Sequence, residues 1–413
     1  MIVQKEEFFH RIKMEWTMSA EVFPSFLTVI ALDKKIENER YITSILDNFQ
    51  KQMKSFSRIS IRKRRKKQDI LNFLNTILYE ETILNLHDVM KPQTLDAILD
   101  EVLEFLRQVR SFAPELTFGD IGQALRNYIV YLMFKEIHQD KTDFNMAAFG
   151  YSMLYPFTDN YIDSINSTPT NKLEYNQIIK DKIQGKVVNP NTLHHSKTCD
   201  LLQAIESTYP RSMFPSIYEL LLIMLEAQEL SLKQQNKDFP LSYEERLNIS
   251  VYKGGISVLI DRFFVNKEIT QEDFLFYLSF GFFLQLADDL QDIGEDSEKG
   301  YSTILTFDRS SPNEEKMVNK LLHYIHNIIT NYTSGTLEFR NFLLTTCYQL
   351  IFTSVIQSKN FFSQEYLLEL EKYLPVTIPF LEQMLNNRIE QSDTQLQNQY
   401  IKFLDELIQV PKH

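Results

Sequence analysis

The chain has 413 residues, of which 44% are hydrophobic and 13% aromatic, and its formal net charge is −12. This composition excludes a disordered chain, and the acidic balance excludes nonspecific nucleic-acid binding, which requires a basic surface. Only 10 glycines and long stretches with a 3.6-residue hydrophobic period predict an all-α protein. Two cysteines are too few for a disulfide framework, and the first residues, MIVQKEEFFHRIK, lack the apolar core of a signal peptide. We therefore expect a cytoplasmic protein.

Residues 1–115 are predicted to form an N-terminal helical region ahead of a helical bundle over 116–413. The densest positive run, RKRRKK, lies at 62–67. Such a run is usually a solvated helix end or linker. Peripheral contact with an anionic membrane surface is the alternative, because clustered Lys and Arg are attracted to anionic lipid.

The first acidic pair lies in YPFTDNYIDS, where Asp159 and Asp163 are four residues apart. On a helix this spacing places both carboxylates on one face. We expect Thr158 to cap the start of that helix, where acidic residues suit the helix dipole. The polar stretch over 164–197 is predicted to be a long loop with room for one short helix.

The second acidic cluster ends the segment FGFFLQLADDLQDIGED, residues 280–296. Asp288, Asp292 and Asp296 form one helical stripe, with Asp289 beside it. Each like-charge pair costs about 0.2–0.5 kcal/mol in an isolated helix, and a glycine inside the helix, Gly294, costs about 1 kcal/mol more. Something outside the local fold should compensate for this cost. Two antiparallel helices of a bundle can face such stripes across a cavity.

Carboxylate clusters without accompanying His or Cys favour Mg²⁺ or Mn²⁺ over zinc. Mg²⁺ is typically held by one or two carboxylates together with waters and substrate phosphates. The two clusters therefore predict a site for a diphosphate. The rings of Phe280, Phe282 and Phe283 before the second cluster suit an allylic carbocation, whose charge aromatic faces stabilise. The alternative is that each ring belongs to the core.

YKGGISVLIDRFF (252–264) followed by FGFFLQLADDLQD (280–292) resembles the second half of trans-prenyl diphosphate synthases. That family has a Lys ahead of an aromatic helix and then F-x-Q-x-x-D-D-x-x-D. The residues that match are Lys253, Phe283, Gln285, Asp288, Asp289 and Asp292.

Other residues resemble squalene and phytoene synthases: LQDIGED, through Asp292 and Asp296, is similar to their second motif, and Asp159 to Asp163 to their first. YPFTDNYIDS, YKGGISVL and LQLADDLQDIGED together resemble bacterial large-terpene synthases. All these relatives belong to the class I isoprenoid synthase superfamily. The specific match covers about a tenth of the chain, and it implies a helical bundle around a central cavity.

The resemblance also implies roles for individual residues. Lys253 and Lys299 would contact the diphosphate, and Gln285 and Phe283 would lie near the substrate. Arg126 and Arg211 are further diphosphate candidates, with an ordinary salt bridge as the alternative for both. Mg²⁺ would be bound from two walls, by Asp159 and Asp163 on one and by Asp288, Asp289, Asp292 and Asp296 on the other.

The chain also departs from the prenyl synthases, which have a paired aspartate and a nearby arginine pair in the first motif. Here Asp159 is followed by Asn160, and no arginine pair follows. A second substrate would lack its usual anion clamp, so we expect a terpene synthase that ionises and cyclises one polyprenyl diphosphate. Alternatives are a prenyltransferase that couples two prenyl diphosphates and a helical binding protein with a degenerate site. A homodimer remains open.

Overall fold

A computed structural model describes residues 5–56, 63–79, 83–141, 143–163, 168–235, 241–306, 314–389 and 394–409. Within these ranges every regular element is helical, which confirms the all-α prediction. The α-helices are α1 (Lys5–Met18), α2 (Leu32–Phe56), α3 (Lys63–Tyr79), α4 (Leu86–Val89), α5 (Pro92–Phe112), α6 (Phe118–Ile137), α7 (Met146–Asp163), α8 (Pro169–Ile183), α9 (Leu193–Thr208), α10 (Pro215–Ser231), α11 (Tyr243–Val265), α12 (Gln271–Gln291), α13 (Ile293–Lys299), α14 (Glu314–Asn331), α15 (Leu337–Gln357), α16 (Gln364–Glu371), α17 (Ile378–Ile389) and α18 (Thr394–Leu407). Two 3₁₀ turns are η2 (Leu232–Gln235) and η3 (Lys359–Phe361).

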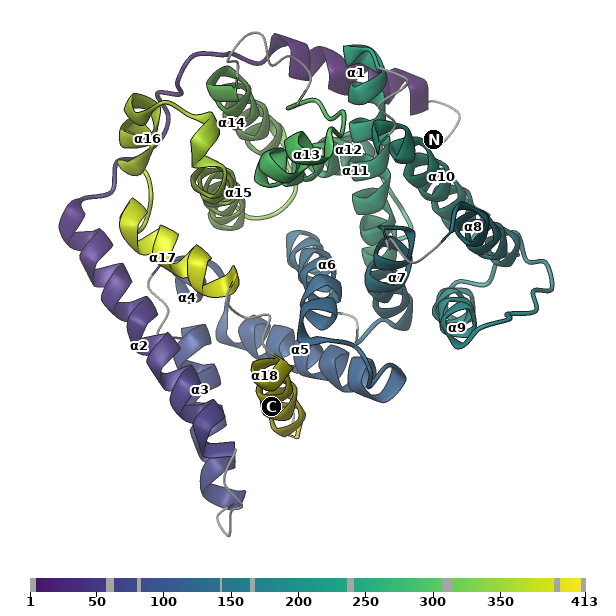
Figure 1. Cartoon of the computed structure of the whole chain (residues 1–413), viewed down its shortest axis with the longest axis horizontal. Coiled ribbons are helices and arrows are strands. Elements are labelled where there is room, and N and C mark those ends of the chain that lie inside the picture. The colour runs from purple at the N-terminus through teal and green to yellow at the C-terminus, as the bar shows by residue number, and fades with distance from the viewer. Residues whose placement is uncertain are drawn as a thin grey trace.

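The helices α11 and α12, here called the central helices, pack against each other along their length (Figure 1). Both are apolar on nearly every face, as expected of helices surrounded by protein. α10 and α6 pack on α11, whereas α14 and α15 pack on α12. Capping boxes at Ser242 and Thr270 start the two central helices.

Three glycines allow the central helices to touch backbone to backbone. A Cβ added at Gly254 would lie 2.2 Å from the carbonyl oxygen of Gly281 and 2.7 Å from Cβ of Gln285. One at Gly255 would lie 3.0 Å from the carbonyl oxygen of Leu278. The glycine pair that follows Lys253 is therefore a packing feature that brings this lysine close to the acidic end of α12.

The predicted N-terminal region is joined to the rest of the molecule by its first helix. Phe8, Phe9 and Trp16 of α1 belong to the same hydrophobic core as α11 and α12. The Trp16 indole N–H donates to the Tyr243 hydroxyl at 2.9 Å. The predicted division near residue 115 stays a prediction.

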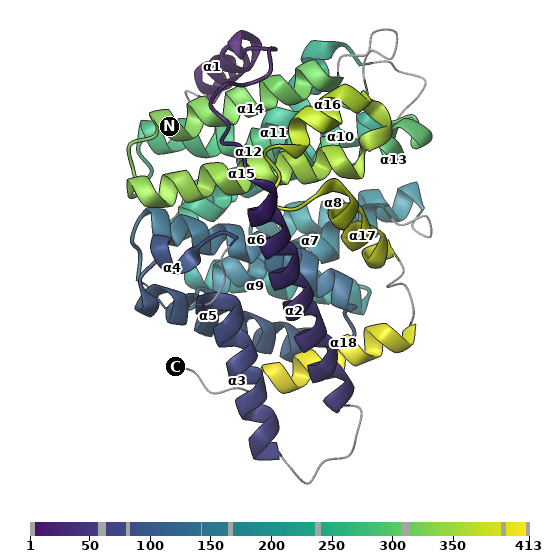
Figure 2. The same cartoon turned by 90° about the vertical axis from the view of Figure 1, so that its left-hand side faces the viewer.

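The helices α2 and α3 form a hairpin that extends away from the central helices, with α18 beside it (Figure 2). A small separate core with Met53, Phe73, Tyr400 and Phe403 joins these three helices. Residues 63–67 of the basic run lie at the start of α3, whereas residue 62 and the side chains of the whole run lie outside the described residues. Membrane contact through this run therefore stays a prediction.

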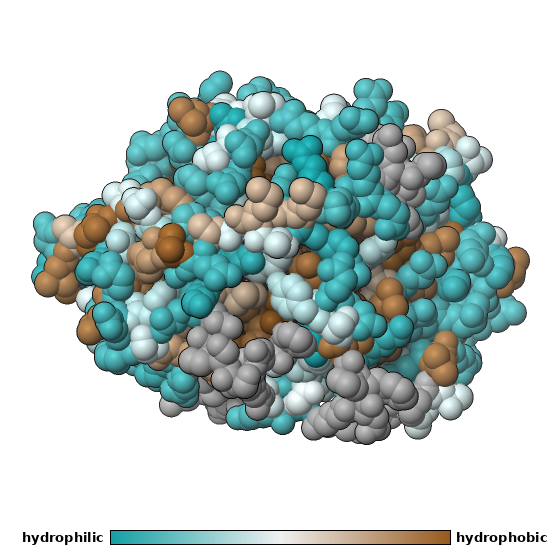
Figure 3. Space-filling view, turned by 90° about the horizontal axis from the view of Figure 1, so that it is seen from above, coloured by the Kyte–Doolittle hydropathy of each residue, from teal (hydrophilic) through white to brown (hydrophobic). Residues whose placement is uncertain are grey.

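In the described ranges, no helix combines the length and apolar character needed to cross a membrane. The face shown in Figure 3 is mostly hydrophilic, with hydrophobic residues in small groups.

A buried polar cluster links α6, α7 and α11. The Asn127 amide donates to the Ser152 hydroxyl at 3.0 Å and to Oδ1 of Asp261 at 3.3 Å. Asp261 is only 1% exposed, and its Oδ2 has no hydrogen-bond partner among the described residues. Burial raises the pKa of Asp261 well above its ordinary value, which the bond from Asn127 only partly offsets.

Replacing Asp261 with asparagine is expected to stabilise the protein at pH 8 by about 1–3 kcal/mol, the usual cost of an unsatisfied buried polar group. Because the folded pKa is raised, the wild-type carboxyl favours folding fully only below its unfolded pKa, and that contribution is lost as the pH rises. The gain should therefore shrink towards pH 4. Urea unfolding at several pH values measures it, with the exposed Asp200→Asn as control. Equal stabilities of Asp261→Asn and wild type at pH 8 would contradict a buried neutral acid.

Candidate functional site

A polar cavity of about 410 Å³, here called the acidic cavity, lies at the end of α12 that carries the aspartates. Its walls come from α6, α7, α10, α11, α12 and α13, together with η2 and the segment after α13. The residues that line it are Gln123, Asn160, Ile162, Gln228, Ser231, Leu232, Gln234, Gln235, Lys253, Gln285, Asp288, Asp289, Asp292, Glu295, Asp296, Lys299, Tyr301 and Thr303.

The aspartates of the second cluster form one wall, as the four-residue spacing predicts. α12 ends at Gln291 and α13 begins at Ile293, but helical hydrogen bonds continue across this junction. The Asp292 N–H donates to the Asp288 carbonyl at 3.0 Å, and the Asp296 N–H to the Asp292 carbonyl at 2.9 Å. Gly294 therefore lies in the first turn of the short α13 and not inside a long helix.

Crowding and burial raise the pKa values of three of these carboxyl groups. The pKa of Asp289 rises to about 7, mainly because the group is buried, and the charge of Asp288 adds to this. A hydrogen bond from Gln285 at 2.9 Å and the charge of Lys253 act in the opposite direction. Burial and the charges of Asp292 and Asp288 raise the pKa of Asp296 to about 6. The pKa of Asp292 also rises, through burial and then through Asp288.

Among the aspartates of this wall, Asp289 is the one whose buried side chain has an oxygen without a described partner. It is 6% exposed, and its Oδ2 accepts no hydrogen bond from any described residue. A buried carboxylate oxygen without a donor is costly unless a cation or a proton satisfies it. This wall is therefore suited to positive charge.

Lys253 and Lys299 are the only basic side chains among the described residues that line the acidic cavity. Lys253 is half-buried on α11 and directly precedes Gly254, the residue at which α11 and α12 come into close contact. Lys299 forms an ion pair with Glu295, and its Nζ lies 5.5 Å from the centre of the Tyr301 ring. The structure thus brings both predicted diphosphate contacts to the same cavity as the second acidic cluster.

The end of α7 borders the acidic cavity through Asn160 and Ile162. Asp159 and Asp163 lie in the last turns of this helix, but their side chains are outside the described residues. The Asn160 amide donates to Asp120 at the start of α6 at 2.8 Å, which fixes this end of α7. The stretch that carries the first acidic pair therefore lies at the same cavity as the second cluster.

The expected helix start at Thr158 is wrong. α7 begins at Met146, continues through Pro156, and has Thr158 in its interior, where the hydroxyl donates to the Leu154 carbonyl at 2.8 Å. Asp159 and Asp163 consequently lie at the C-terminal end of the helix, where the dipole disfavours negative charge. Their position costs free energy locally, which a cation bound at this end would offset.

The expected long loop over 164–197 is also wrong for most of its length. It contains the whole of α8 and the start of α9, and residues 164–167 lie outside the described part. Thr168 caps α8 by accepting the N–H of Asn171 at 3.2 Å, and Pro169 occupies the first helical position. The loop was predicted because Asn, Thr and Lys are abundant in this stretch, and these two helix-start signals were overlooked.

Three predicted substrate contacts do not line the acidic cavity. Phe283 is fully buried and packs against Phe280, with ring centres 5.9 Å apart. Arg126 is exposed on α6. The Arg211 guanidinium donates to Glu206 at 2.8 Å and to the carbonyls of Ile183 and Lys182, which gives it the ordinary salt-bridge role.

The sequence analysis missed an amide-rich part of the cavity lining. Gln228 and Ser231 at the end of α10 and Gln234 and Gln235 of η2 all line the acidic cavity. The signal was present in the sequence: Gln228, Ser231 and Gln235 share one helical face after an apolar run. Amides at that spacing were not recognised because they carry no charge.

The segment after α13 was also missed. Tyr301 and Thr303 line the acidic cavity, and Ser302 between them is held in place by three bonds. The Ser302 N–H donates to the Gln234 carbonyl at 2.8 Å, and the Gln234 amide donates back to the Ser302 carbonyl at 3.3 Å. The buried Arg246 donates to the Ser302 hydroxyl at 2.7 Å. Ser302 is far from Gln234 and Arg246 in the sequence, so no local sequence pattern predicts these contacts.

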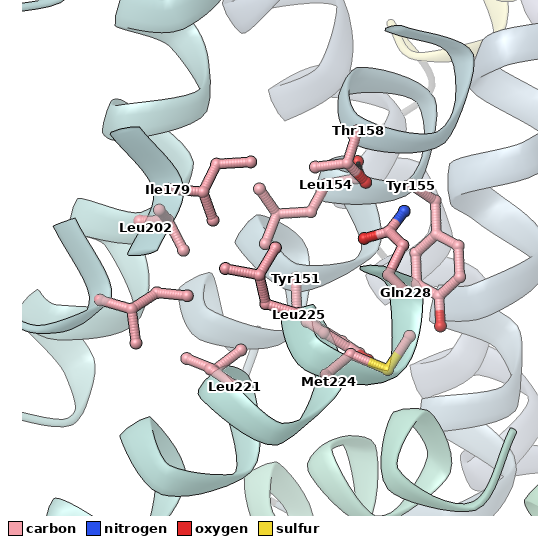
Figure 4. Close-up of a pocket in the computed structure, with 11 residues that line it drawn as sticks. Tyr151, Leu154, Tyr155, Thr158, Ile179, Leu202, Leu221, Met224, Leu225 and Gln228 are labelled. Carbon is pink, nitrogen blue, oxygen red and sulfur yellow. Dashed lines mark hydrogen bonds between the residues drawn. The ribbon is translucent and has the colours of Figure 1, made fainter. Parts of the chain in front are cut away.

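A second cavity of about 60 Å³, here called the apolar cavity, lies beside the acidic one between α7, α8, α9 and α10 (Figure 4). Apart from Thr158 and Gln228, hydrophobic and tyrosine side chains line it: Tyr151, Leu154, Tyr155, Ile179, Ile183, Leu202, Leu221, Met224 and Leu225. Gln228 lines both cavities, and α7 contributes different residues to each, so a polar compartment and an apolar one are neighbours.

No protein-family model, curated protein or solved structure matches this chain. In the described part of the chain, no group of three or more His, Cys, Asp or Glu side chains is arranged to hold a metal ion by itself. Any ion at the acidic cavity would therefore need further ligands, such as a phosphate, water or the carboxylates of Asp159 and Asp163.

Proposed function

We propose that this protein is a class I terpene synthase that ionises a polyprenyl diphosphate and cyclises the resulting cation. The observation that carries the proposal is the position of the acidic cavity: the end of α7 and the aspartates of α12 border it together, and an apolar cavity adjoins it. An amphipathic diphosphate ester has a headgroup for the first compartment, and the second adjoins the place where its hydrocarbon chain would begin.

The chemistry of the wall fits Mg²⁺. Asp288, Asp289, Asp292 and Asp296 offer only hard oxygen donors, and the unpartnered Oδ2 of Asp289 is open to a cation. Asp159 and Asp163 would complete the binding from α7. When bound, Mg²⁺ would neutralise the diphosphate and make it a better leaving group.

The protein residues contribute binding, position and exclusion of water. Lys253 would contact the diphosphate from α11 and also balance the carboxylates, since its charge lowers the pKa of Asp289. Gln285 orients Asp289 through its hydrogen bond. Tyr301 and Thr303 would cover the headgroup, while the apolar cavity would keep water from the hydrocarbon chain.

The basic residues of the cavity favour one diphosphate over two. Two lysines share the lining with the carboxylates of Asp288, Asp289, Asp292, Glu295 and Asp296, and the other polar residues from α10 and η2 are neutral. A coupling enzyme has to hold a second anionic substrate, for which neutral amides are weak ligands. Arg126 and Arg211, the further candidate diphosphate contacts, lie outside the lining.

Incubation of the purified protein with C10 to C35 prenyl diphosphates and Mg²⁺, followed by gas chromatography of the extract, tests the proposal. A cyclic hydrocarbon or alcohol from one substrate, with release of diphosphate, is the expected result. A longer chain made from two substrates would favour the prenyltransferase alternative. No diphosphate release from any substrate would favour the binding protein with a degenerate site.

A further inference from the structure

A short segment after α13, residues 301–303, belongs to the wall of the acidic cavity and is bonded to a buried arginine of α11. Tyr301 and Thr303 line the cavity. Ser302, between them, accepts a hydrogen bond from the Arg246 guanidinium at 2.7 Å. Arg246 is 5% exposed and does not itself line the cavity. A buried cation is thus linked to the lining through one serine side chain.

Further hydrogen bonds close the same segment into a turn. The Tyr301 N–H donates to a carbonyl of α13 at 2.8 Å, and the Thr303 N–H donates to the Thr306 hydroxyl at 2.9 Å. That hydroxyl donates in turn to the Tyr301 carbonyl at 2.7 Å. The bonds of Ser302, to Gln234 of η2 and to α11, join this turn to two other elements of the lining.

The position of Arg246 on α11 suits it to hold this turn. Arg246 precedes Lys253 by about two helical turns, so both residues lie on the same face of α11. Lys253 lines the acidic cavity directly. Because the guanidinium is charged, its bond to Ser302 is stronger than a bond between two neutral groups. Because the guanidinium is buried, water does not readily replace that bond.

We propose that Arg246 is a positioning residue of the acidic cavity and that, through Ser302, it holds Tyr301 and Thr303 in the lining before a ligand binds. The inference rests on the proposed function. It assigns the turn after α13 to the binding of the metal–diphosphate headgroup. A turn that is ordered in advance loses little conformational freedom when the headgroup binds, so the affinity is higher.

Two variants remove the bond from opposite ends. Ser302→Ala removes the acceptor and leaves Arg246 in place, whereas Arg246→Met removes the charged donor from a side chain of similar length. Both should increase the hydrogen-exchange rates of the Tyr301 and Ser302 amides about 10-fold, because a hydrogen bond to a charged group contributes at least that factor. Ser207→Ala, which removes an exposed serine hydroxyl from α9, is the matched control and should leave these rates unchanged.

Calorimetric titration with inorganic diphosphate in the presence of Mg²⁺ measures the consequence for binding. We expect Kd to rise about 10-fold in Ser302→Ala and in Arg246→Met, and to keep the wild-type value in Ser207→Ala. The double variant should bind about as weakly as Arg246→Met alone, because both changes break the same contact. Separate structural contributions of the two residues would instead give losses that add.

Urea unfolding shows whether each variant is folded, and Ser302→Ala, which leaves the buried charge in place, decides the question if Arg246→Met unfolds. Wild-type affinity for the metal–diphosphate complex in Ser302→Ala would overturn the inference and leave the proposed function standing. Losses that add in the double variant would do the same. A wild-type protein that does not bind diphosphate with Mg²⁺ would overturn the proposed function and this inference with it.

Discussion

Replacing Asp288 with alanine is expected to lower Mg²⁺-dependent diphosphate release by at least about 10²–10³-fold. Asp288 lines the acidic cavity, and its charge helps to raise the pKa values of Asp289, Asp292 and Asp296. Its loss removes a carboxylate for the cation while relieving like-charge repulsion, so the fold should be retained. Assays of released diphosphate and the helical circular dichroism spectrum measure the two effects.

Glu298→Ala is the matched control for this loss of an acidic side chain. Glu298 is exposed on the neighbouring α13 and does not line the acidic cavity. Its removal should leave turnover within a few-fold of wild type. Full activity in Asp288→Ala, or an equal loss in both variants, would refute the specific role of the aspartate stripe.

Replacing Gly281 with alanine is expected to destabilise the protein by about 3 kcal/mol or more, at the upper end of the usual cost of overpacking. The added Cβ would lie 2.2 Å from the Gly254 carbonyl oxygen and 2.8 Å from Cα of Gly255. Both atoms belong to backbone, so α11 and α12 must move apart. The movement would also shift Lys253 relative to Gln285, and activity should fall with stability.

Gly122→Ala is the control for a glycine inside a helix, because a Cβ there meets nothing within 4 Å. It should stabilise α6 by about 0.5–1 kcal/mol. Urea unfolding of both variants gives the comparison. If Gly281→Ala proved as stable as wild type, the close contact between the central helices would be wrong.

The sequence predicted most of what depends on local periodicity. The 3.6-residue pattern was enough for the all-α fold, and the four-residue spacing placed Asp288, Asp292 and Asp296 on one wall. Lys253 and Gln285 could be placed beside that wall because they belong to a motif with a fixed order. The identity of the reaction still rests on that resemblance, and it stays a prediction.

Features that depend on tertiary contacts were not predictable in the same way. The helix start was placed at Thr158 because Thr before Asp is a common cap, but tertiary packing extends α7 back to Met146. The packing role of Gly254 and Gly255 could not be predicted, because it depends on their close contact with Gly281 of α12. The position of Gln228 in the lining of both cavities could not be predicted, because an uncharged side chain gives little signal in a sequence.

Calorimetric titration of the protein with inorganic diphosphate, in the presence and absence of Mg²⁺, tests the central claim most directly. The claim is that α7 and α12 together hold a metal–diphosphate complex at the acidic cavity. Diphosphate should bind the wild-type protein only when Mg²⁺ is present, and either Asp159→Asn or Asp288→Asn should weaken that binding strongly. Tight binding without Mg²⁺, or undiminished binding in both variants, would contradict the claim.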